Sequence, residues 1–326
     1  MGFVFIKFAC FCSALNDSVL YTFMEKREPC GVLIVNKHEG VTSHDIVYKI
    51  RRLYGTPRVG HTGTLDPMAS GVLAVLVGRA AKAAEYLVCD SKRYRAALRL
   101  GLTTDTEDTS GEVLTRSDSL PTADEVVRVC ERFRGSYDQI PPMYSALKVG
   151  GQKLCDLARR GVTVERQARR VEIYSLEVTP TEAEDTYLLD VSCSSGTYIR
   201  TLCADIGAAL GCGGVMASLC RSCAGDFKIE DAVTIAELEQ MTAEQREARL
   251  IPTEALFSSL PHLKLAPFYE KLCRNGCEIY QKKIGTRLEV GERVRLCGAD
   301  GFFAIGEVRE YPEGTAVKSI KIFDLT

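Results

Sequence analysis

A glycine-rich loop between two apolar runs constrains the fold of this chain more than any other feature. The loop, residues 60–71, reads Gly-His-Thr-Gly-Thr-Leu-Asp-Pro-Met-Ala-Ser-Gly. Its glycines permit unusual backbone angles, while Pro67 restricts Asp66 to an extended conformation. The flanking runs, Val32 to Val35 and Val72 to Val77, are typical of buried strands. The pattern predicts a sheet that presents Asp66 on a constrained loop, although the same residue types are common in ordinary turns.

Composition and charge bound the rest of the chain. With 326 residues and 46% hydrophobic content, it can form one substantial core and a smaller module. A formal charge of −2 does not by itself indicate a polyanionic partner. Between Lys148 and Arg170, however, seven basic residues face only two acidic ones. This local surplus predicts a surface that contacts phosphates, and a solvated helix face is the alternative.

The fourteen cysteines are scattered, and most lie in apolar runs, which favours buried free thiols over disulfides. Cys220 and Cys223 have a spacing seen in zinc sites, and with Cys273 and Cys277 they form a possible four-thiolate set. If residues 216–223 form a strand, Cys220 and Cys223 should point to opposite faces and cannot chelate one ion. We therefore expect no bound metal.

Residues 1–23 contain an apolar stretch, Phe3 to Phe11, that is interrupted by Lys7. A secretory signal would carry a more basic start, and the stretch is too short to span a membrane. Met24 begins a hydrophilic run. We expect residues 1–23 to be a loosely ordered extension or to precede the true start at Met24, and we expect a cytoplasmic protein without membrane contact.

Periodicity and turn residues predict an irregular mixture of strands and helices. Since strands and helices do not alternate regularly, the sequence favours an α+β class with a largely antiparallel mixed sheet. A connector with acidic helices follows at residues 229–261, and residues 262–326 read as a compact β module. Predicted strands are 31–36, 94–100, 171–178, 187–193 and 216–223, and predicted helices are 42–55, 79–88, 123–133, 153–160 and 198–210.

The loop at 60–71 resembles the signature of the TruB family of tRNA pseudouridine synthases, and the resemblance extends over residues 31–326. The resemblance implies a catalytic domain of the pseudouridine synthase type at residues 24–228 and a PUA-like RNA-binding domain at residues 262–326. Supporting motifs are Lys92-Arg93-Tyr94-Arg95, the stretch from Gly101 to Thr106, Ile140-Pro141-Pro142-Met143-Tyr144-Ser145-Ala146-Leu147-Lys148 and Ser195-Gly196-Thr197-Tyr198-Ile199-Arg200.

The family resemblance implies isomerisation of uridine to pseudouridine in the TΨC loop of tRNA, at position 55 in tRNA numbering. The enzyme flips the base out, uses no cofactor or metal, takes the T-arm of tRNA as its partner and acts as a monomer. The aspartate that matches Asp66 is essential in the family. A carboxylate can add to the base or the sugar, or remove a sugar proton, and the sequence leaves these routes open.

Arg200 matches the family arginine that pairs with this aspartate. A carboxylate in a pocket that excludes water tends to take up a proton, and a fixed cation opposes this. A charge-assisted bond from Arg200 would both orient Asp66 and keep it ionised. The alternative is a surface arginine at a helix start, a position that the helix macrodipole disfavours.

Two tyrosines are candidates for contact with the base. Strand alternation places the ring of Tyr94 on one face and the side chains of Arg93 and Arg95 on the other. Stacking of an aromatic ring on an unstacked base contributes roughly 1 to 3 kcal/mol. In the family the matching tyrosine contacts the target base, and Tyr198 is expected to line the same pocket. Ordinary core tyrosines are the alternative for both.

The family resemblance assigns four further residues. His61 would insert where the flipped nucleotide had been, Leu219 would line the pocket, and Lys37 and Lys148 would contact RNA. The usual Asp-Lys-Pro motif reads Asn36-Lys37-His38 here, and Cys220 replaces the usual arginine.

Two other functions were weighed against the isomerase. A tRNA-binding folding factor would keep the basic segment but would need no ionised Asp66. A nucleotide enzyme with a phosphate-binding loop would need a Gly-x-x-x-x-Gly-Lys-Ser/Thr motif, which this sequence lacks.

Overall fold

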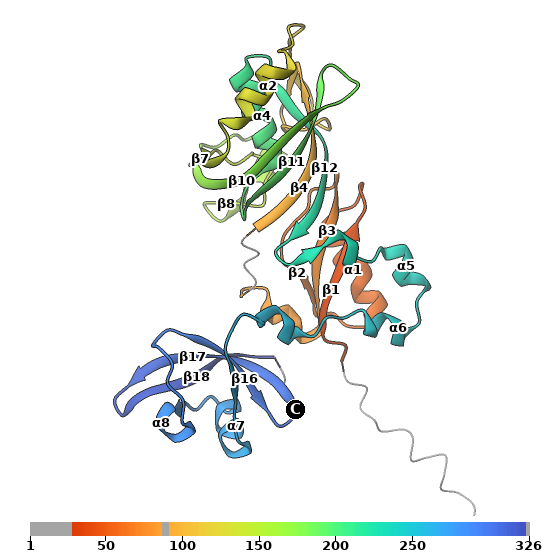
Figure 1. The fold of residues 1–326 in the computed structure, drawn as a ribbon. Helices are drawn as coiled ribbons and strands as arrows, with labels where there is room; N and C mark the ends of the chain where they lie inside the picture. The colour runs from red at the N-terminus through yellow and green to blue at the C-terminus, as the bar shows by residue number, and fades with distance from the viewer. Residues whose placement is uncertain (1–27, 87–90, 324–326) are drawn as a thin grey trace, which may run out of the picture.

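The structure, a computed structural model, describes residues 28–86 and 91–323, which form two large sheets and two small two-stranded ones (Figure 1). The expectations for residues 1–23 and for a start at Met24 lie outside the described residues. Within the described part, none of the helices has the length and apolar character needed to cross a membrane.

The larger sheet has nine strands in a mixed but largely antiparallel arrangement. Its main path runs β1-β3-β12-β4-β11-β10-β7, and only the β3–β12 pair is parallel among the pairs of this sheet in the described residues. This arrangement confirms the predicted α+β class. The strands are β1 Gly31–Lys37, β2 Val59–His61, β3 Ala69–Val77, β4 Ser91–Leu100, β7 Gly135–Gln139, β10 Arg169–Pro180, β11 Thr186–Ser194, β12 Gly214–Ala224 and β13 Phe227–Lys228.

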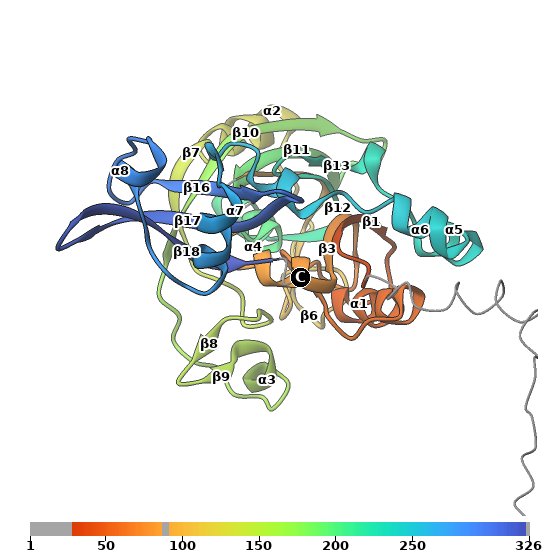
Figure 2. The ribbon, with the colours of Figure 1, turned by 90° about the horizontal axis from the view of Figure 1, so that it is seen from below.

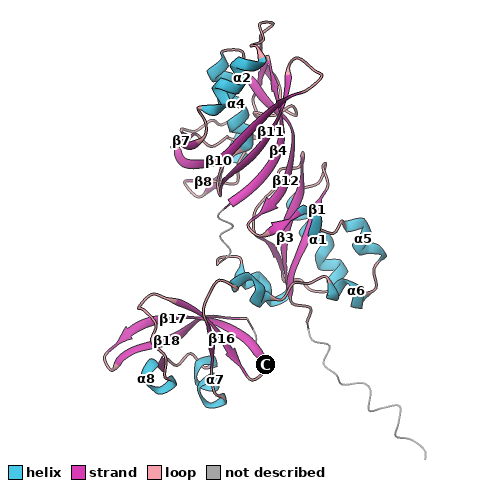
Figure 3. Cartoon of the chain, in the orientation of Figure 1, coloured by secondary structure: helices cyan, strands magenta, loops and turns pink. Residues whose placement is uncertain are grey.

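Helices cover one face of this sheet and share a core with it (Figure 3). These helices are α1 Ser43–Tyr54, α2 Ala123–Glu131, α4 Ile199–Leu210 and α5 Ile235–Gln240. Alternate residues of β1 and β3 point to the opposite face of the sheet. Apolar side chains from residues 229–256, which include Ile229 and Ile251, cover that face. Because β1 and β3 are buried on both faces, their sequences are continuous apolar runs.

The helix predicted at residues 42–55 is α1, and both of its ends are capped. Thr42 is the N-cap and forms a capping box with Asp45, and Gly55 ends the helix in a left-handed conformation. The helix predicted at residues 79–88 is different: the described part contains a short 3₁₀ helix, η1 Gly78–Ala83. Its buried residues Ala80 and Ala83 are three positions apart, a spacing that places both on one side of a 3₁₀ helix.

Two small hairpins extend from the larger sheet. Figure 2 shows β8, β9 and α3 projecting away from the main body. The helix predicted at residues 153–160 is shorter than expected, because the chain leaves helical geometry after Ala158 and turns at Gly161, whose φ is +72°. The elements are β5 Leu102–Thr104, β6 Val113–Arg116, β8 Lys148–Val149, β9 Gln152–Lys153 and α3 Leu154–Ala158.

The C-terminal sheet has five strands in the order β14-β16-β17-β18-β15 and a core of its own. The C-terminal sheet meets residues 229–261 and Ala83 at a cluster in which Phe257, Phe302 and Phe323 pack together. We propose that the larger sheet with its helices and the C-terminal sheet with its own core are separate domains, joined by residues 229–261. The elements are η2 Ile229–Asp231, α6 Ala243–Ala248, η3 Thr253–Phe257, β14 His262–Lys264, α7 Pro267–Arg274, β15 Ile279–Tyr280, α8 Gln281–Ile284, β16 Arg293–Gly298, β17 Gly301–Tyr311 and β18 Gly314–Ile322.

Gly71 lies where three strands of the larger sheet meet. It is opposite Lys37 in β1 and opposite Arg221 in β12. Its φ is +104°, and a Cβ atom at this position would clash with the backbone of Arg221. The parallel contact between β3 and β12 therefore requires glycine here.

We predict that Gly71→Ala lowers the free energy of unfolding by about 2 kcal/mol or more, because left-handed backbone strain alone costs roughly 1–2 kcal/mol and the clash adds to it. Urea unfolding followed by circular dichroism measures the change. Gly60→Ala is the matched control, since no atom lies within 4 Å of a Cβ built there. Equal stability of the two variants would contradict this account.

Candidate active site

The loop that carries Asp66 connects β2 to β3 and is fixed at several points. The Ser43 hydroxyl, buried in α1, donates to the Leu65 carbonyl at 3.0 Å and accepts from the Leu65 amide at 2.8 Å. The Asp66 carbonyl accepts from the Ala69 amide, and the Pro67 carbonyl accepts from the Gly40 amide. Asp66 is therefore held by its backbone on both sides, as the sequence predicted for this loop.

Two buried cations bind the carbonyl groups of the same loop. Lys37 Nζ donates to the carbonyls of His38, Val41 and Pro67 at 2.8 to 3.3 Å. On the other side, the Arg221 guanidinium, 2% exposed, donates to three carbonyls. These belong to Val72 at 2.8 Å, Gly63 at 3.1 Å and Thr64 at 3.4 Å. The two side chains connect the segments before and after Asp66 to β1 and β12.

The position of Lys37 corrects the expectation that this lysine contacts RNA. Its side chain is fully buried, and its ammonium group is occupied by backbone carbonyls. Burial lowers the pKa of Lys37 to about 8, and the nearby Asp66 carboxylate opposes that shift. In this conformation Lys37 supports the loop and has no exposed surface to offer a phosphate.

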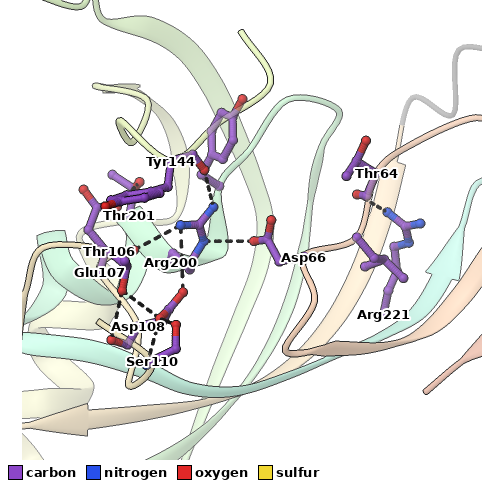
Figure 4. A network of polar contacts seen from close by, with 12 residues as sticks. Thr64, Asp66, Thr106, Glu107, Asp108, Ser110, Tyr144, Arg200, Thr201 and Arg221 are labelled. Carbon is purple, nitrogen blue, oxygen red and sulfur yellow. Dashed lines mark hydrogen bonds and ion pairs between the residues drawn. The ribbon is translucent and has the colours of Figure 1, made fainter. Parts of the chain in front are cut away.

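Arg200 and Asp66 form an ion pair, as expected, with 2.9 Å between Nε and Oδ2 (Figure 4). The guanidinium is buried, with 5% of its side chain exposed, whereas 36% of the Asp66 side chain is exposed. Its other nitrogens donate to the carbonyls of Thr106 at 3.0 Å and Tyr144 at 2.8 Å. A buried arginine with a bond from each of its three nitrogens thus holds a carboxylate that a ligand can still reach.

A second carboxylate, Asp108, lies 3.9 Å from the Arg200 guanidinium and is almost fully buried. Its Oδ1 accepts from the Thr106 hydroxyl at 2.8 Å and from the Ser110 amide at 2.9 Å. The two carboxylates offset the cost of burying a cation at the first turn of α4, where the helix dipole opposes it. The sequence motifs did not indicate Asp108; the Thr-x-Asp-x-Ser spacing of residues 106–110, typical of a turn held by side-chain hydrogen bonds, is the signal that marks it.

Two further acidic residues, Glu107 and Asp205, contact α4 or lie in it. Glu107 accepts from the Thr201 hydroxyl at 2.5 Å and has a positive φ of 65°. Burial raises the pKa of Glu107, while Thr201 and Arg200 lower it. In the second turn of α4, burial raises the pKa of Asp205 to about 6, and the Glu107 charge adds to that shift.

Tyr94 follows the predicted strand alternation. Its ring is 6% exposed and faces the helix-covered core, whereas Arg93 and Arg95 are exposed on the other face and pair with Asp190. Burial raises the pKa of the Tyr94 phenol, the Arg221 charge opposes this, and the Asp66 carboxylate adds a smaller rise. Tyr94 is opposite Arg221 in the β4–β12 pair, and Arg221 binds carbonyls of the loop that carries Asp66.

Tyr198 is the N-cap residue of α4, two positions before Arg200, and is half-buried. Burial raises the pKa of its phenol, and the Asp66 carboxylate again contributes to the rise. The structure therefore brings Asp66, Arg200, Tyr94 and Tyr198 into one neighbourhood.

His61 and Leu219 lie beside this group. His61 is half-buried at the end of β2, its Nδ1 is buried without a hydrogen-bond partner, and burial together with Arg221 lowers its pKa. Its imidazole is therefore neutral at neutral pH. Leu219 is 7% exposed in β12, opposite Ala69 and Ala96, and belongs to the main core.

Lys148 lies in the β8–β9 hairpin, and its side chain is exposed. The other basic residues of the segment Lys148 to Arg170 are also on the surface, except Arg166, which is half-buried and donates to the Pro141 carbonyl at 3.0 Å. The structure thus places Lys148 on the projecting arm formed by β8, β9 and α3.

The opposite face of the larger sheet carries a groove of about 390 Å³, lined in part by Arg95, Asp190 and Cys220.

Cys223 lies on the same face of the sheet as Cys220, which corrects the prediction that Cys220 and Cys223 face apart. A bulge between Arg221 and Cys223 shifts the register, so that Cys220 is opposite Arg95 and Cys223 is opposite Arg93. Among residues 28–86 and 91–323, no cluster of three or more metal-ligating side chains occurs.

Two sequence profiles match most of the larger domain. Residues 51–199 match the profile of the TruB family pseudouridylate synthase N-terminal domain. Residues 200–258 match that of the tRNA pseudouridylate synthase B C-terminal domain.

Curated relatives match nearly the whole chain. A protein of Alkaliphilus oremlandii named tRNA pseudouridine synthase B is 42% identical over 90% of this chain and 98% of its own length. One of the same name from Clostridium kluyveri is 43% identical over 90% of this chain and 99% of its own length.

Solved structures agree in fold. One chain of a Cbf5-Nop10-Gar1 complex has a TM-score of 0.66 and 26% identity, covering 90% of this chain and 85% of the other. A chain of the archaeal box H/ACA sRNP Nop10-Cbf5 complex has a TM-score of 0.66 and 25% identity, covering 91% and 87%. These matches confirm the fold predicted for the larger domain.

The raised pKa of Asp205 predicts that the free energy of unfolding depends on pH. The folded state keeps the Asp205 proton up to about pH 6, whereas the ordinary pKa is 3.8, so stability falls as pH rises through this interval. We expect Asp205→Asn to raise the free energy of unfolding above pH 6 by at most about 3 kcal/mol, since one pKa unit corresponds to roughly 1.4 kcal/mol. Below pH 4 the gain should vanish.

Urea unfolding of both proteins between pH 3.5 and pH 8 measures this difference. Asp118→Asn, at an exposed aspartate, is the matched control and should show no such trend. A gain for Asp205→Asn that is independent of pH would contradict the assignment.

Proposed function

The chain belongs to the TruB family of tRNA pseudouridine synthases, and from this premise we propose that it isomerises the uridine at position 55, in the TΨC loop of tRNA. It is an isomerase that converts uridine in tRNA to pseudouridine. The observation that carries the proposal is the ion pair between a buried Arg200 and a partly exposed Asp66. The reaction breaks the N-glycosidic bond, rotates the uracil and joins its carbon 5 to the sugar, so product and substrate have the same atoms.

Asp66 is the group that we propose to carry out the chemistry. Its carboxylate lies 2.9 Å from the Arg200 guanidinium, and the backbone on both sides is fixed by Ser43, Lys37 and Arg221. Such an oxygen can add to the base or the sugar, or remove a sugar proton, and can leave again. The Arg200 guanidinium restricts the direction of the Asp66 carboxylate, and this preorganisation avoids reorganisation during the reaction.

Tyr94 and Tyr198 are proposed to border the uracil, because Tyr94 is opposite Arg221, which binds the Asp66 loop, and Tyr198 lies two positions before Arg200. Extrusion of a base from a structured loop costs a few kcal/mol of stacking, which a side chain in the gap partly restores. His61 suits that role because its imidazole is neutral and can stack without adding a buried charge. Leu219, which pairs with Ala69 beside the loop, is proposed to support the pocket wall.

RNA contact outside the pocket is proposed for the projecting arm. Lys148 and most of the other basic side chains of the segment to Arg170 are exposed, and such a surface binds phosphates with a salt-dependent affinity. We propose that the T-arm is recognised by shape, stacking and backbone contacts. We further propose that the protein acts as a monomer in the cytoplasm and without a metal.

A tRNA-binding folding factor is the competing function, and it does not require the Asp66 carboxylate. We predict that Asp66→Ala lowers the rate of pseudouridine formation by about 10⁴-fold or more, the upper range for one acid or base group. The Kd for tRNA should change by less than about threefold, since uniform binding contacts remain. Single-turnover kinetics and filter binding measure the two effects, with exposed Asp118→Ala as control. Full activity of Asp66→Ala would place the chemistry elsewhere.

The position of the product tests the substrate. Purified protein is incubated with unmodified tRNA, without ATP or added metal, and pseudouridine is mapped by chemical sequencing. We predict modification at position 55 of the T loop. Modification confined to ribosomal RNA would overturn the proposed substrate and leave the reaction type intact.

A further inference from the structure

Gln139 is a buried amide at the end of β7, with 1% of its surface exposed. Its Oε1 accepts from the Tyr198 amide at 2.8 Å, and its Nε2 donates to the Tyr198 carbonyl at 3.0 Å. The same Nε2 donates to the Tyr137 hydroxyl at 2.6 Å. Gln139 therefore holds both backbone polar groups of Tyr198, as a paired strand would, and both of its amide hydrogens are used.

This contact occurs where the backbone changes from strand to helix. Tyr198 is the N-cap of α4, and its own side chain makes no capping bond. Its carbonyl also accepts the first helical bond, from the Leu202 amide at 3.0 Å. Gln139 consequently fixes the start of the helix whose second residue is Arg200, and connects it to the edge strand β7.

The network returns to α4 one turn later. Tyr137, whose hydroxyl accepts from Gln139, interacts electrostatically with Asp205 in the second turn of α4. Tyr137 is itself held by an edge-to-face contact with Phe133, with 5.4 Å between ring centroids. Both the acceptor oxygen and the donor nitrogen of the Gln139 amide thus have bonded partners, which fixes the orientation of the amide.

We propose that Gln139 is a positioning residue for the isomerisation, which sets the Tyr198 ring relative to Asp66 through the Tyr198 backbone. This inference rests on the proposed function. Arg200 has bonds of its own to the carbonyls of Thr106 and Tyr144, so loss of Gln139 should displace Tyr198 more than Arg200. The expected consequence is a slower chemical step on tRNA that is still bound.

The C-terminal domain provides a matched control. Gln281 is 5% exposed, its Oε1 accepts from the Leu288 amide at 2.8 Å, and its Nε2 donates to the Leu288 carbonyl at 3.1 Å. Its Nε2 also donates to the Thr315 hydroxyl at 2.9 Å. Gln281 makes the same three types of bond in another core, so Gln281→Leu reports the effect of losing such an amide on stability alone.

The test compares Gln139→Leu with Gln281→Leu in full-length protein. We predict that Gln139→Leu lowers the single-turnover rate constant at saturating tRNA by about 10²-fold, the effect of an approximately 1 Å misplacement of reacting groups. Its Kd for tRNA should stay within about threefold of wild type, since uniform binding contacts remain. Gln281→Leu should lower the unfolding midpoint to a similar degree and leave the rate constant unchanged.

Equal rate constants for Gln139→Leu and wild type, or equal slowing by both variants, would overturn the proposal. If Gln139→Leu fails to fold, Gln139→Glu takes its place, since it keeps the acceptor for the Tyr198 amide and loses the donors. That variant should be slowed about 10-fold, within the range in which misplacement acts, and a wild-type rate would again overturn the proposal. Failure of the proposed function is separate: wild type itself would then form no pseudouridine in tRNA.

Discussion

The ion pair between Asp66 and Arg200 is the interaction on which the site depends. It joins the β2–β3 loop to the first turn of α4, and the arginine is buried whereas the aspartate remains partly open. A buried guanidinium needs bonded partners, and here the carbonyls of Thr106 and Tyr144 accept from it while the Asp108 carboxylate lies 3.9 Å away. The rest of the larger domain can be understood as the support for this pair. Lys37 and Arg221 bind the loop by its carbonyls, and the parallel contact of β3 with β12 brings Arg221 to it.

Much of the fold follows from local signals in the sequence. The Thr42 cap, the apolar positions of α1 and Gly55 predict that helix correctly because each end has its own hydrogen-bonding requirement. The apolar runs of β1 and β3 indicate strands covered on both faces. The apolar clusters on the two faces of the larger sheet confirm this. The contact of Arg200 with Asp66 was expected from the family resemblance, since 134 positions separate them and no local pattern links them. Alternation correctly placed Tyr94 opposite its neighbouring arginines.

The features that the sequence did not reveal depend on tertiary contacts. Lys37 resembles a solvent-exposed lysine before a turn, and only the convergence of three carbonyls explains its burial. The bulge in β12 reverses the expected direction of Cys223, and no residue of that strand signals it. Gln139 is one polar residue among several near the end of β7. Its partner Tyr198 is 59 positions away, so its role emerges only when β7 and α4 are placed together.

The central claim is that Arg200 holds Asp66 in the geometry and charge that the reaction needs. The most direct test is the single-turnover rate constant of pseudouridine formation by Arg200→Lys at saturating tRNA. Lysine keeps the positive charge but cannot reproduce the planar set of donors that reaches Asp66, Thr106 and Tyr144 together. The account predicts a fall of about 10²-fold or more, as misplaced catalytic groups produce, with tRNA binding retained. A rate constant equal to that of wild type would contradict it.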